Sequence, residues 1–277
     1  MLGRALAASS PGGVDLRPMS HEQLDVTGNS AVTATLDAVR PDVVINASGY
    51  TSVDRAESER SLAFALNASA VEMLGKACAR RGITVLHFST DYVFDGAASR
   101  PYREIDPPSP INCYGESKLE GERALLSSGA PTLLIRTQWL FGAHGASFPK
   151  TMWDRARRGS VTCVVNDQRG RPTSAADLAG ATWELIKRRA LGLFNVANTG
   201  EATWHDVAEL IFSRCGVPDL LTSCSTSESS RPARRPPYSV LDTTRVERVL
   251  GSKLPHWKDA LRTFLDALEA SEKSHPV

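Results

Sequence analysis

Three short segments of this chain are mainly hydrophobic, without alternation of apolar and polar residues: residues 43–47, 84–88 and 132–136. A strand with one face in water alternates apolar and polar side chains, whereas a strand that is buried on both faces does not. These runs therefore predict neighbouring strands in the interior of a parallel sheet, and a further strand is expected at residues 14–16.

A helical pattern lies between the first two runs. Residues 61–80 place their apolar side chains on one broad stripe and end at Arg80-Arg81-Gly82, which is typical of a helix C-terminus. Strand, helix and strand form a βαβ crossover, and its repetition predicts a doubly wound α/β fold with a Rossmann-like parallel sheet. Ligands of such folds bind at the carboxyl ends of the strands, so the loops that follow the three runs are expected to share one crevice.

The pattern changes from about residue 142 onward. Expected helices are 148–159, 174–189, 204–215 and 257–269, and expected strands are 160–165 and 192–197, the second of which returns to the main sheet. Residues 222–237, rich in serine, threonine, arginine and proline, are expected to be irregular.

The composition favours a soluble cytoplasmic protein. With 32 basic and 31 acidic residues the formal charge is +1, which gives no overall attraction to nucleic acid or to an anionic membrane. No apolar run reaches the roughly 18 residues of a membrane span, and the first residues lack a signal-peptide pattern. The five cysteines form no C-x-x-C pair and the six histidines no H-x-x-x-H pair, so we expect neither a disulfide framework nor a metal site.

Candidate chemistry comes from Tyr114 and Lys118, which stand four residues apart. On a helix they share one face, and an ammonium beside a phenol favours the phenolate, so Lys118 is expected to lower the pKa of Tyr114 from about 10. Thr90 offers a hydroxyl to the same substrate oxygen. Together these side chains predict reduction of a ketone, with Tyr114 protonating oxygen as hydride reaches carbon. The structural alternatives are a partly buried tyrosine beside a solvated lysine, and a threonine that caps a strand end.

The motifs add up to a family resemblance that covers nearly the whole chain. The chain resembles the dTDP-4-dehydrorhamnose reductases, of the extended short-chain dehydrogenase/reductase superfamily, in residues 41–57, 89–96, 114–122, 136–142, 167–173 and 235–242. This resemblance implies a dinucleotide-binding domain at 1–141 and 174–198, a sugar-nucleotide-binding region at 142–173 and 199–272, and a tail at 273–277.

The resemblance also implies roles for single residues. Tyr114 would be the general acid, Lys118 would lower its pKa and bind the nicotinamide ribose, and Thr90 would hydrogen-bond the reacting carbonyl. The cofactor would be NADPH, with NADH left open, and the implied cofactor-binding residues are Leu2, Gly3, Asp25, Val26, Ala47, Ser48, Gly49, Tyr50, Thr51, Tyr114 and Lys118. Around a dTDP-4-keto-6-deoxysugar, the implied substrate-binding residues are Thr90, Asp91, Tyr92, Trp139 and Arg235.

Several of these residues have structural alternatives. Asp25 is also a natural helix N-cap, and Trp139 a natural core aromatic. Arg235 for the substrate diphosphate and Arg17 for a cofactor 2′-phosphate compete with ordinary surface arginines. Gln138 stands where the family pattern has serine, which bears on the identity of the sugar.

The beginning of the chain departs from the family pattern. The family opens with a strand and a Gly-x-x-Gly-x-x-Gly turn, whose N–H groups hold the cofactor pyrophosphate at a helix N-terminus. Gly3 matches the third glycine, so the first strand is expected to be missing and its neighbours to have unpaired backbone groups. We therefore expect the natural product to start about ten residues upstream of Met1.

Two classes of function follow. The first is an NADPH-dependent reductase that converts dTDP-4-dehydro-β-L-rhamnose to dTDP-β-L-rhamnose, or reduces another dTDP-4-keto-6-deoxysugar. The second is a non-catalytic regulatory subunit with the same fold. Retention of Thr90, Tyr114 and Lys118 favours the enzyme. The pattern leaves the ketosugar, the preference between NADPH and NADH, and the formation of a homo-oligomer open.

Overall fold

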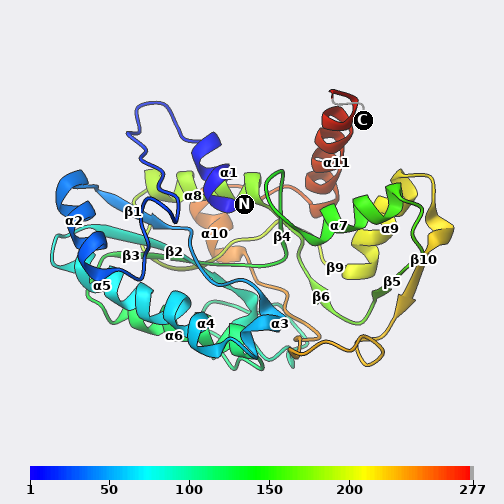
Figure 1. Cartoon of the computed structure of the whole chain (residues 1–277), viewed down its shortest axis with the longest axis horizontal. Helices are drawn as coiled ribbons and strands as arrows, with labels where there is room; N and C mark the ends of the chain where they lie inside the picture. Colours follow the sequence, from blue (N-terminus) through cyan, green and yellow to red (C-terminus); the bar gives the residue numbers. More distant parts are fainter. Residues whose placement is uncertain (275–277) are drawn as a thin grey trace.

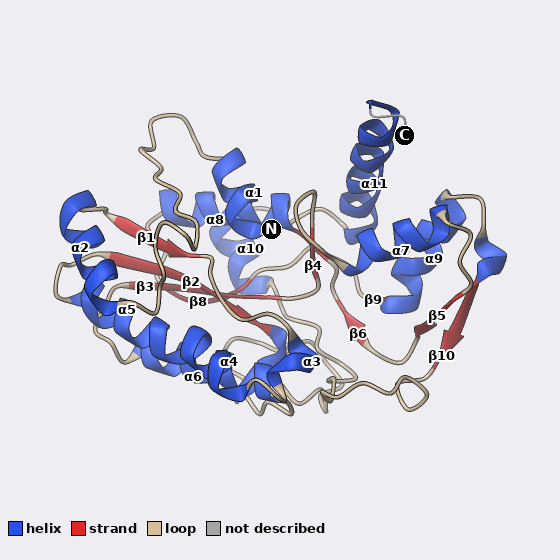
Figure 2. Cartoon of the chain, in the orientation of Figure 1, coloured by secondary structure: helices blue, strands red, loops and turns tan. Residues whose placement is uncertain are grey.

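The computed structural model describes residues 1–274 and has a parallel sheet at its centre (Figure 1; strands in red in Figure 2). The strands run in the order β1-β2-β3-β8, with β1 at Val43–Asn46, β2 at Thr84–Thr90, β3 at Thr132–Thr137 and β8 at Gly192–Asn195. Each pairing is parallel, and β2 and β3 are buried along almost their whole length. The three predicted strands are confirmed, with β1 at the edge of the sheet, and residues 192–195 return to the sheet as predicted.

Helices cover both faces of this sheet (Figure 1). One face carries α1 (Leu2–Ala8), α8 (Ala175–Lys187) and α10 (Thr244–Leu250), and the other carries α4 (Arg60–Phe64), α5 (Ala70–Ala79) and α6 (Cys113–Leu126). The side chains of β2 alternate between the two faces of the sheet: Leu86 and Phe88 pack with α1 and α8, and Val85 packs with α5. The predicted doubly wound α/β fold is therefore confirmed.

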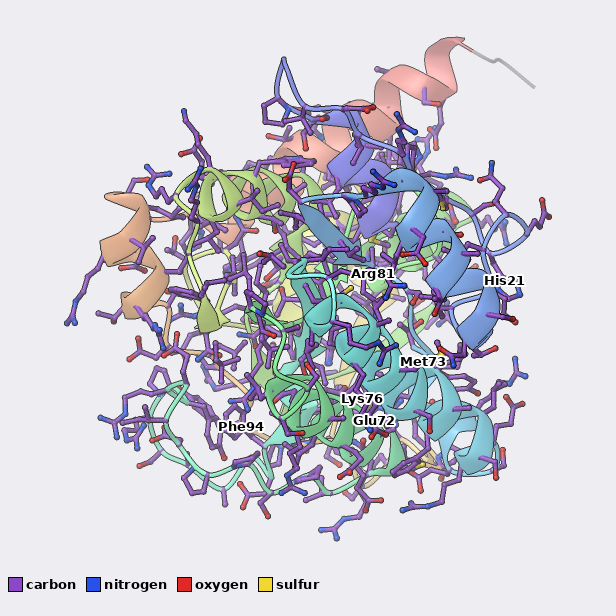
Figure 3. The ribbon with its side chains drawn as sticks, turned by 90° about the vertical axis from the view of Figure 1, so that its left-hand side faces the viewer. His21, Glu72, Met73, Lys76, Arg81 and Phe94 are labelled. Carbon is purple, nitrogen blue, oxygen red and sulfur yellow. The ribbon has the colours of Figure 1, made fainter. Side chains whose placement is uncertain are left out.

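Helix α2 (Asn29–Val39) extends the α5 side of the molecule, which Figure 3 views with Glu72, Met73 and Lys76 labelled on α5. Val32 of α2 packs into the same core as α5. On the outer surface Lys76 Nζ lies 2.5 Å from Glu72 Oε1, an i, i+4 ion pair. The layer is thus apolar toward the sheet and charged toward solvent.

The helix predicted over residues 61–80 is interrupted. Between α4 and α5 the chain makes a π-helical turn, η1 (Ala65–Ser69). Asn67 in this turn is fully buried; its Oδ1 accepts from the Tyr50 N–H at 2.8 Å, and its Nδ2 donates to the Tyr50 carbonyl at 3.0 Å. The wider turn therefore holds the loop after β1, a role that apolar periodicity does not reveal.

A smaller lobe lies beside the sheet, on the right in Figure 1. It contains the parallel pair β5 (Thr162–Val165) and β10 (Leu221–Cys224), with helices α7 (Phe148–Arg157), α9 (Trp204–Arg214) and α11 (Trp257–Ser274). These elements enclose a core of their own. Helix α11 runs past its predicted end at residue 269 and includes the first residues of the predicted tail; residues 275–277 lie outside the described part of the chain.

Short elements join the two lobes. Strand β4 (Leu140–Phe141) pairs with β7 (Thr173–Ser174), and β6 (Arg169–Gly170) pairs with β9 (Ala202–Thr203). The remaining short helices are α3 (Val53–Ala56), η2 (Asp91–Val93) and η3 (Pro218–Leu220). Figure 1 places β4 and β6 between the lobes, so the segment after β3 leads directly from one lobe to the other.

Residues 9–28 form an irregular connection, and the strand predicted at 14–16 is wrong. Within residues 1–274, β1 is an edge strand that pairs with β2 alone, so residues 14–16 have no strand beside them to complete a ladder. A helix with the length and apolar character of a bilayer span does not occur in the described part of the chain.

Candidate active site

The loops at the carboxyl ends of the first three strands meet beside α6. Thr90, the last residue of β2, pairs in register with Thr137, the last residue of β3. The loop after β1 reaches the same place through Asn67, whose Nδ2 also donates to Ser117 Oγ of α6 at 2.9 Å. The predicted convergence of post-strand loops is therefore confirmed for these elements.

Helix α6 carries both Tyr114 and Lys118, and its first turn is fixed in two ways. The Asn112 side chain caps the helix by accepting from the Gly115 N–H at 2.8 Å. A Cβ on Gly115 would lie 2.1 Å from the Tyr92 carbonyl oxygen. Glycine at this position thus lets the helix lie directly against the loop that follows β2.

Lys118 is buried, with 5% of its surface exposed. Its Nζ donates to the Phe88 carbonyl oxygen at 2.5 Å and lies 3.2 Å from His87 Nε2. Burial lowers the pKa of Lys118 to about 8, and the negative charge of Glu122 partly opposes this shift. The alternative of a solvated surface lysine is therefore wrong.

His87 links Lys118 to the loop after β1. Asn46 Oδ1 accepts from the Ser48 N–H at 3.1 Å and from Ser48 Oγ at 2.5 Å, which turns its Nδ2 toward His87 Nδ1 at 3.2 Å. Burial, followed by the positive charge of Lys118, lowers the pKa of His87 well below its usual range. His87 is therefore a neutral ring that lies between two donors, Lys118 Nζ and Asn46 Nδ2, and its single acceptor nitrogen serves one of them.

Tyr114 is partly exposed and its ring meets Tyr92 edge-on, with centroids 5.9 Å apart. Burial raises the pKa of Tyr114 to about 12; a hydrogen bond with Thr90 opposes this shift and the charge of Asp91 adds to it. This direction is opposite to the acidification expected from Lys118. In the protein alone the phenol keeps its proton, which is the form that a proton donor requires.

Asp91 lies behind Thr90 with only 2% of its surface exposed. Its Oδ1 accepts from Thr90 Oγ1 at 3.0 Å, whereas its Oδ2 is buried with no hydrogen-bond partner among the described residues. Burial raises the pKa of Asp91 to about 7, although the nearby hydroxyls of Ser239 and Thr90 favour the carboxylate. A carboxyl group that is neutral for part of the physiological range therefore backs the Thr90 hydroxyl.

Trp139 follows β3 two residues after Thr137 and is partly exposed at the junction of the lobes. Its ring stacks on Trp204 of α9 at a centroid distance of 3.7 Å and an interplanar angle of 8°. The neighbouring Gln138 is buried, and its Oε1 accepts from the Arg171 N–H at 3.0 Å. An aromatic pair thus lies just beyond the carboxyl end of β3, at the junction of the lobes.

Over residues 1–270 the sequence matches the family described as the RmlD substrate binding domain. The chain belongs to this family. It is 37% identical to the dTDP-4-dehydrorhamnose reductase of Sinorhizobium fredii, over 95% of this chain and 93% of that protein. It is 38% identical to a Streptomyces antibioticus protein named as a probable dTDP-4,6-dihydroxy-2-methyloxan-3-one 4-ketoreductase, over 100% of this chain and 94% of that one.

A solved structure agrees with these sequence matches. The crystal structure of dTDP-4-dehydrorhamnose reductase from Bacillus anthracis in complex with NADP aligns with a TM-score of 0.92 and 35% identity, covering 96% of this chain and 95% of that one. The family resemblance drawn from the motifs is therefore confirmed.

The loop that the family resemblance assigns to the cofactor, residues 47–51, lies next to Lys118. Ala47, Ser48 and Thr51 are exposed, and Tyr50 is anchored by its Oη, which donates to Glu59 Oε2 at 2.7 Å. A Cβ on Gly49 would lie 3.0 Å from Asn67 Oδ1 and 3.9 Å from Lys118 Nζ. The loop thus has an open backbone within reach of the lysine.

The other residues that the family resemblance assigns to the cofactor lie near this loop or at the surface of the protein. Leu2, the first residue of α1, is buried in the core. A Cβ on Gly3 would lie 3.7 Å from the Ala47 Cβ, so the start of α1 adjoins the loop after β1. Asp25 is exposed and its Oδ1 accepts from the Thr27 N–H at 2.9 Å, a turn ahead of α2; Val26 beside it is partly buried. The N-cap of α2 is Gly28, so Asp25 is not the helix cap that was the alternative.

The arginines expected at phosphates have carboxylate partners within this chain. Arg235 is largely buried, and its Nη1 and Nη2 lie 2.7 and 2.8 Å from the two oxygens of Asp54. The ion pair lowers the pKa of Asp54. Arg17 is an exposed residue, and its Nη2 lies 2.9 Å from Asp15 Oδ2. Neither guanidinium is free in this structure to meet a phosphate.

Sequence reasoning missed four residues that shape the site. His87 lies on β2 and Asn46 on the edge strand β1, and Trp204 and Asp54 lie far along the chain from the residues they contact. A histidine inside a buried apolar run was the available signal, because a buried polar side chain needs a partner. For the other three no local pattern indicated the contact.

Proposed function

We propose that this chain is an NADPH-dependent reductase that converts the 4-keto group of dTDP-4-dehydro-β-L-rhamnose to the alcohol of dTDP-β-L-rhamnose. One observation carries the proposal: Tyr114, whose phenol keeps its proton, shares α6 with a buried Lys118 at the carboxyl ends of the strands. Membership of the family whose relatives bear the reductase name supports the same reaction.

The cofactor fits the residues that are present. An ammonium has three N–H donors, and two contacts of Lys118, to Phe88 and His87, leave one donor toward the open backbone of residues 47–51. That direction suits the hydroxyls of a ribose. When bound, the reduced nicotinamide supplies the hydride, and the solved relative that contains NADP favours NADPH.

Side chains of this protein then bind and protonate the carbonyl oxygen of the substrate. Tyr114 gives up its Oη proton as negative charge develops there, and the Thr90 hydroxyl, which donates to Asp91 Oδ1 in the protein alone, turns to donate to the same oxygen. Lys118 lies one helical turn further along and stabilises the phenolate that remains. The products are an alcohol and an oxidised cofactor, and Tyr114 must regain a proton before the next cycle.

Several features support the substrate class and the compartment. Trp139, a partly exposed indole just beyond the end of β3, offers an apolar contact to a deoxyhexose. The Streptomyces antibioticus relative carries the name of a different dTDP-linked 4-ketoreductase, so other dTDP-4-keto-6-deoxysugars belong in the test. The five cysteines are free thiols, which suits the reducing cytoplasm.

The test is NADPH oxidation, followed by absorbance, with dTDP-4-dehydrorhamnose and related dTDP-4-keto sugars. Wild type should turn over at least one of them, and Tyr114→Phe should lose about 100-fold or more in kcat while still binding NADPH. Tyr102→Phe is the matched control, since it removes another buried phenol, which donates to Asp95 at 2.8 Å outside the site. Equal kcat for wild type and Tyr114→Phe would defeat the proposed proton donor, and no turnover of any such sugar would defeat the proposed reaction.

A further inference from the structure

Trp139 has a backbone conformation that tryptophan rarely adopts. Its φ is +48°, in the left-handed region, and it follows directly on the buried Gln138 at the end of β3. A residue persists in such a conformation when the surrounding structure determines it. The contacts of the Trp139 ring and backbone therefore identify what determines its position.

Three contacts fix Trp139. The Thr173 N–H donates to its carbonyl oxygen at 3.1 Å, which continues the β4–β7 pairing. A Cβ on Gly170 would lie 2.4 Å from Trp139 Cε2, so the ring occupies the space that a side chain at residue 170 would need. The third contact is the parallel stack on Trp204, the closest aromatic pair among the described residues.

Trp204 is itself held firmly. It is the first residue of α9, directly after Thr203, and Thr203 and Asp206 form a reciprocal capping box across it. Its Nε1 donates to Gln168 Oε1 at 3.2 Å, and Phe148 packs against its ring at a centroid distance of 4.6 Å. The smaller lobe thus presents Trp204 as a rigid surface to the ring of Trp139.

We propose that Trp204 is a positioning residue for the hexose subsite, which holds the Trp139 ring where it contacts the sugar of the dTDP-sugar. The inference rests on the proposed function, because the ligand it names is the substrate of that reaction. Trp139 is partly exposed two residues after the end of β3, and Trp204 contacts its ring from the smaller lobe. Plain core packing is the competing explanation, and it predicts a loss of stability with no change in sugar binding.

The experiment measures binding by calorimetry of two ligands, dTDP-L-rhamnose and dTDP, to the full chain. Trp204→Ala should weaken dTDP-L-rhamnose by about 10-fold and leave dTDP, which lacks the hexose, within about 2-fold of wild type. Trp204→Phe keeps an aromatic ring and should recover most of the affinity. Trp183→Phe is the control: this tryptophan is buried on α8 and donates to the Leu6 carbonyl at 3.1 Å, away from the strand ends, so both affinities should match wild type.

A double-mutant cycle gives the second readout. If Trp204 acts through Trp139, then Trp139→Ala alone and the double variant should bind dTDP-L-rhamnose equally weakly. Where Trp204→Ala does not fold, Gly170→Ala displaces the Trp139 ring from another side and should produce the same selective loss. Equal weakening of both ligands, unchanged sugar affinity, or independent effects in the cycle would overturn the inference. Loss of turnover by wild type tests the reaction separately, because these affinities need no catalysis.

Discussion

Gly121 marks the closest approach of α6 to the π-helical turn η1. A Cβ on Gly121 would lie 1.9 Å from the Asn67 carbonyl oxygen, whereas ordinary contact begins at 3.4 Å. The neighbour is backbone, which cannot rotate away as a side chain can. Gly121→Ala therefore requires α6 and η1 to separate by about 1.5 Å, the difference between these two distances.

This displacement should affect both stability and catalysis. Overpacking of this kind costs about 1–3 kcal/mol of unfolding free energy. Lys118 lies three residues before Gly121 on the same helix, and Asn67 holds the loop after β1, so the separation moves the two sides of the proposed cofactor site apart. A misplacement of about 1 Å in a reacting group lowers turnover by about 100-fold.

The assay combines urea unfolding with NADPH-dependent turnover at saturating substrate. Gly180→Ala is the matched control, because Gly180 also lies inside a helix, α8, and a Cβ there meets nothing within 4 Å. That control should gain about 0.5–1 kcal/mol of stability, since alanine favours the helix, and should keep full activity. If Gly121→Ala were as stable and as active as Gly180→Ala, the reasoning from close helix packing would be wrong.

Three further predictions concern buried polar groups. Because burial raises the pKa of Asp91 to about 7, the folded protein loses stability as pH rises from about 4 to about 7. The unfolding free energy of Asp91→Asn should therefore rise relative to that of wild type across this window, by up to about 4 kcal/mol. Urea titrations at pH 5 and pH 8 check this, and a stability difference that does not change with pH contradicts it. Because the pKa of Lys118 is about 8, kcat should fall above pH 8, and Glu122→Gln, which removes a charge that raises this pKa, should move the fall to lower pH. Asn67→Ala leaves the Tyr50 N–H and carbonyl without their buried partner and should cost about 2–4 kcal/mol in thermal or urea unfolding, whereas an effect below about 0.5 kcal/mol would show that the loop does not depend on Asn67.

The central sheet was predictable because its signal is local. In strands buried on both faces, apolar residues do not alternate with polar ones, and β1, β2 and β3 each contain such an apolar run. The Tyr114 and Lys118 pair was predictable for the same reason, since four residues on a helix fix the relation of two side chains. The π-helical turn was not, because the apolar stripe runs through it and its cause is the tertiary contact of Asn67 with Tyr50.

The environment of Lys118 also depended on tertiary structure. A lysine on a helix with charged neighbours has the pattern of a solvated residue, and only the packing of α6 on β2 places it against His87 and the Phe88 carbonyl. The stack of Trp139 on Trp204 joins residues 65 positions apart in the chain, through the β6–β9 pairing. The ion pair of Arg235 could not be predicted either, because its partner Asp54 lies on the short helix α3, far from Arg235 in the chain.

The pKa values of Tyr114 and Lys118 together indicate at which stage each residue contributes. A phenol whose pKa is raised to about 12 is a weak acid, yet an alkoxide is a stronger base than a phenolate, so the proton still moves downhill once hydride has reached carbon. The cost of burial falls on the phenolate that is left behind. The nearby Thr90 hydroxyl lowers this cost, and we expect the Lys118 ammonium to stabilise the same anion once substrate and cofactor are bound. The contribution of Lys118 to proton transfer is therefore largest after the proton has left Tyr114, which is why protonation of Lys118 rather than acidity of the resting phenol should limit the reaction at high pH.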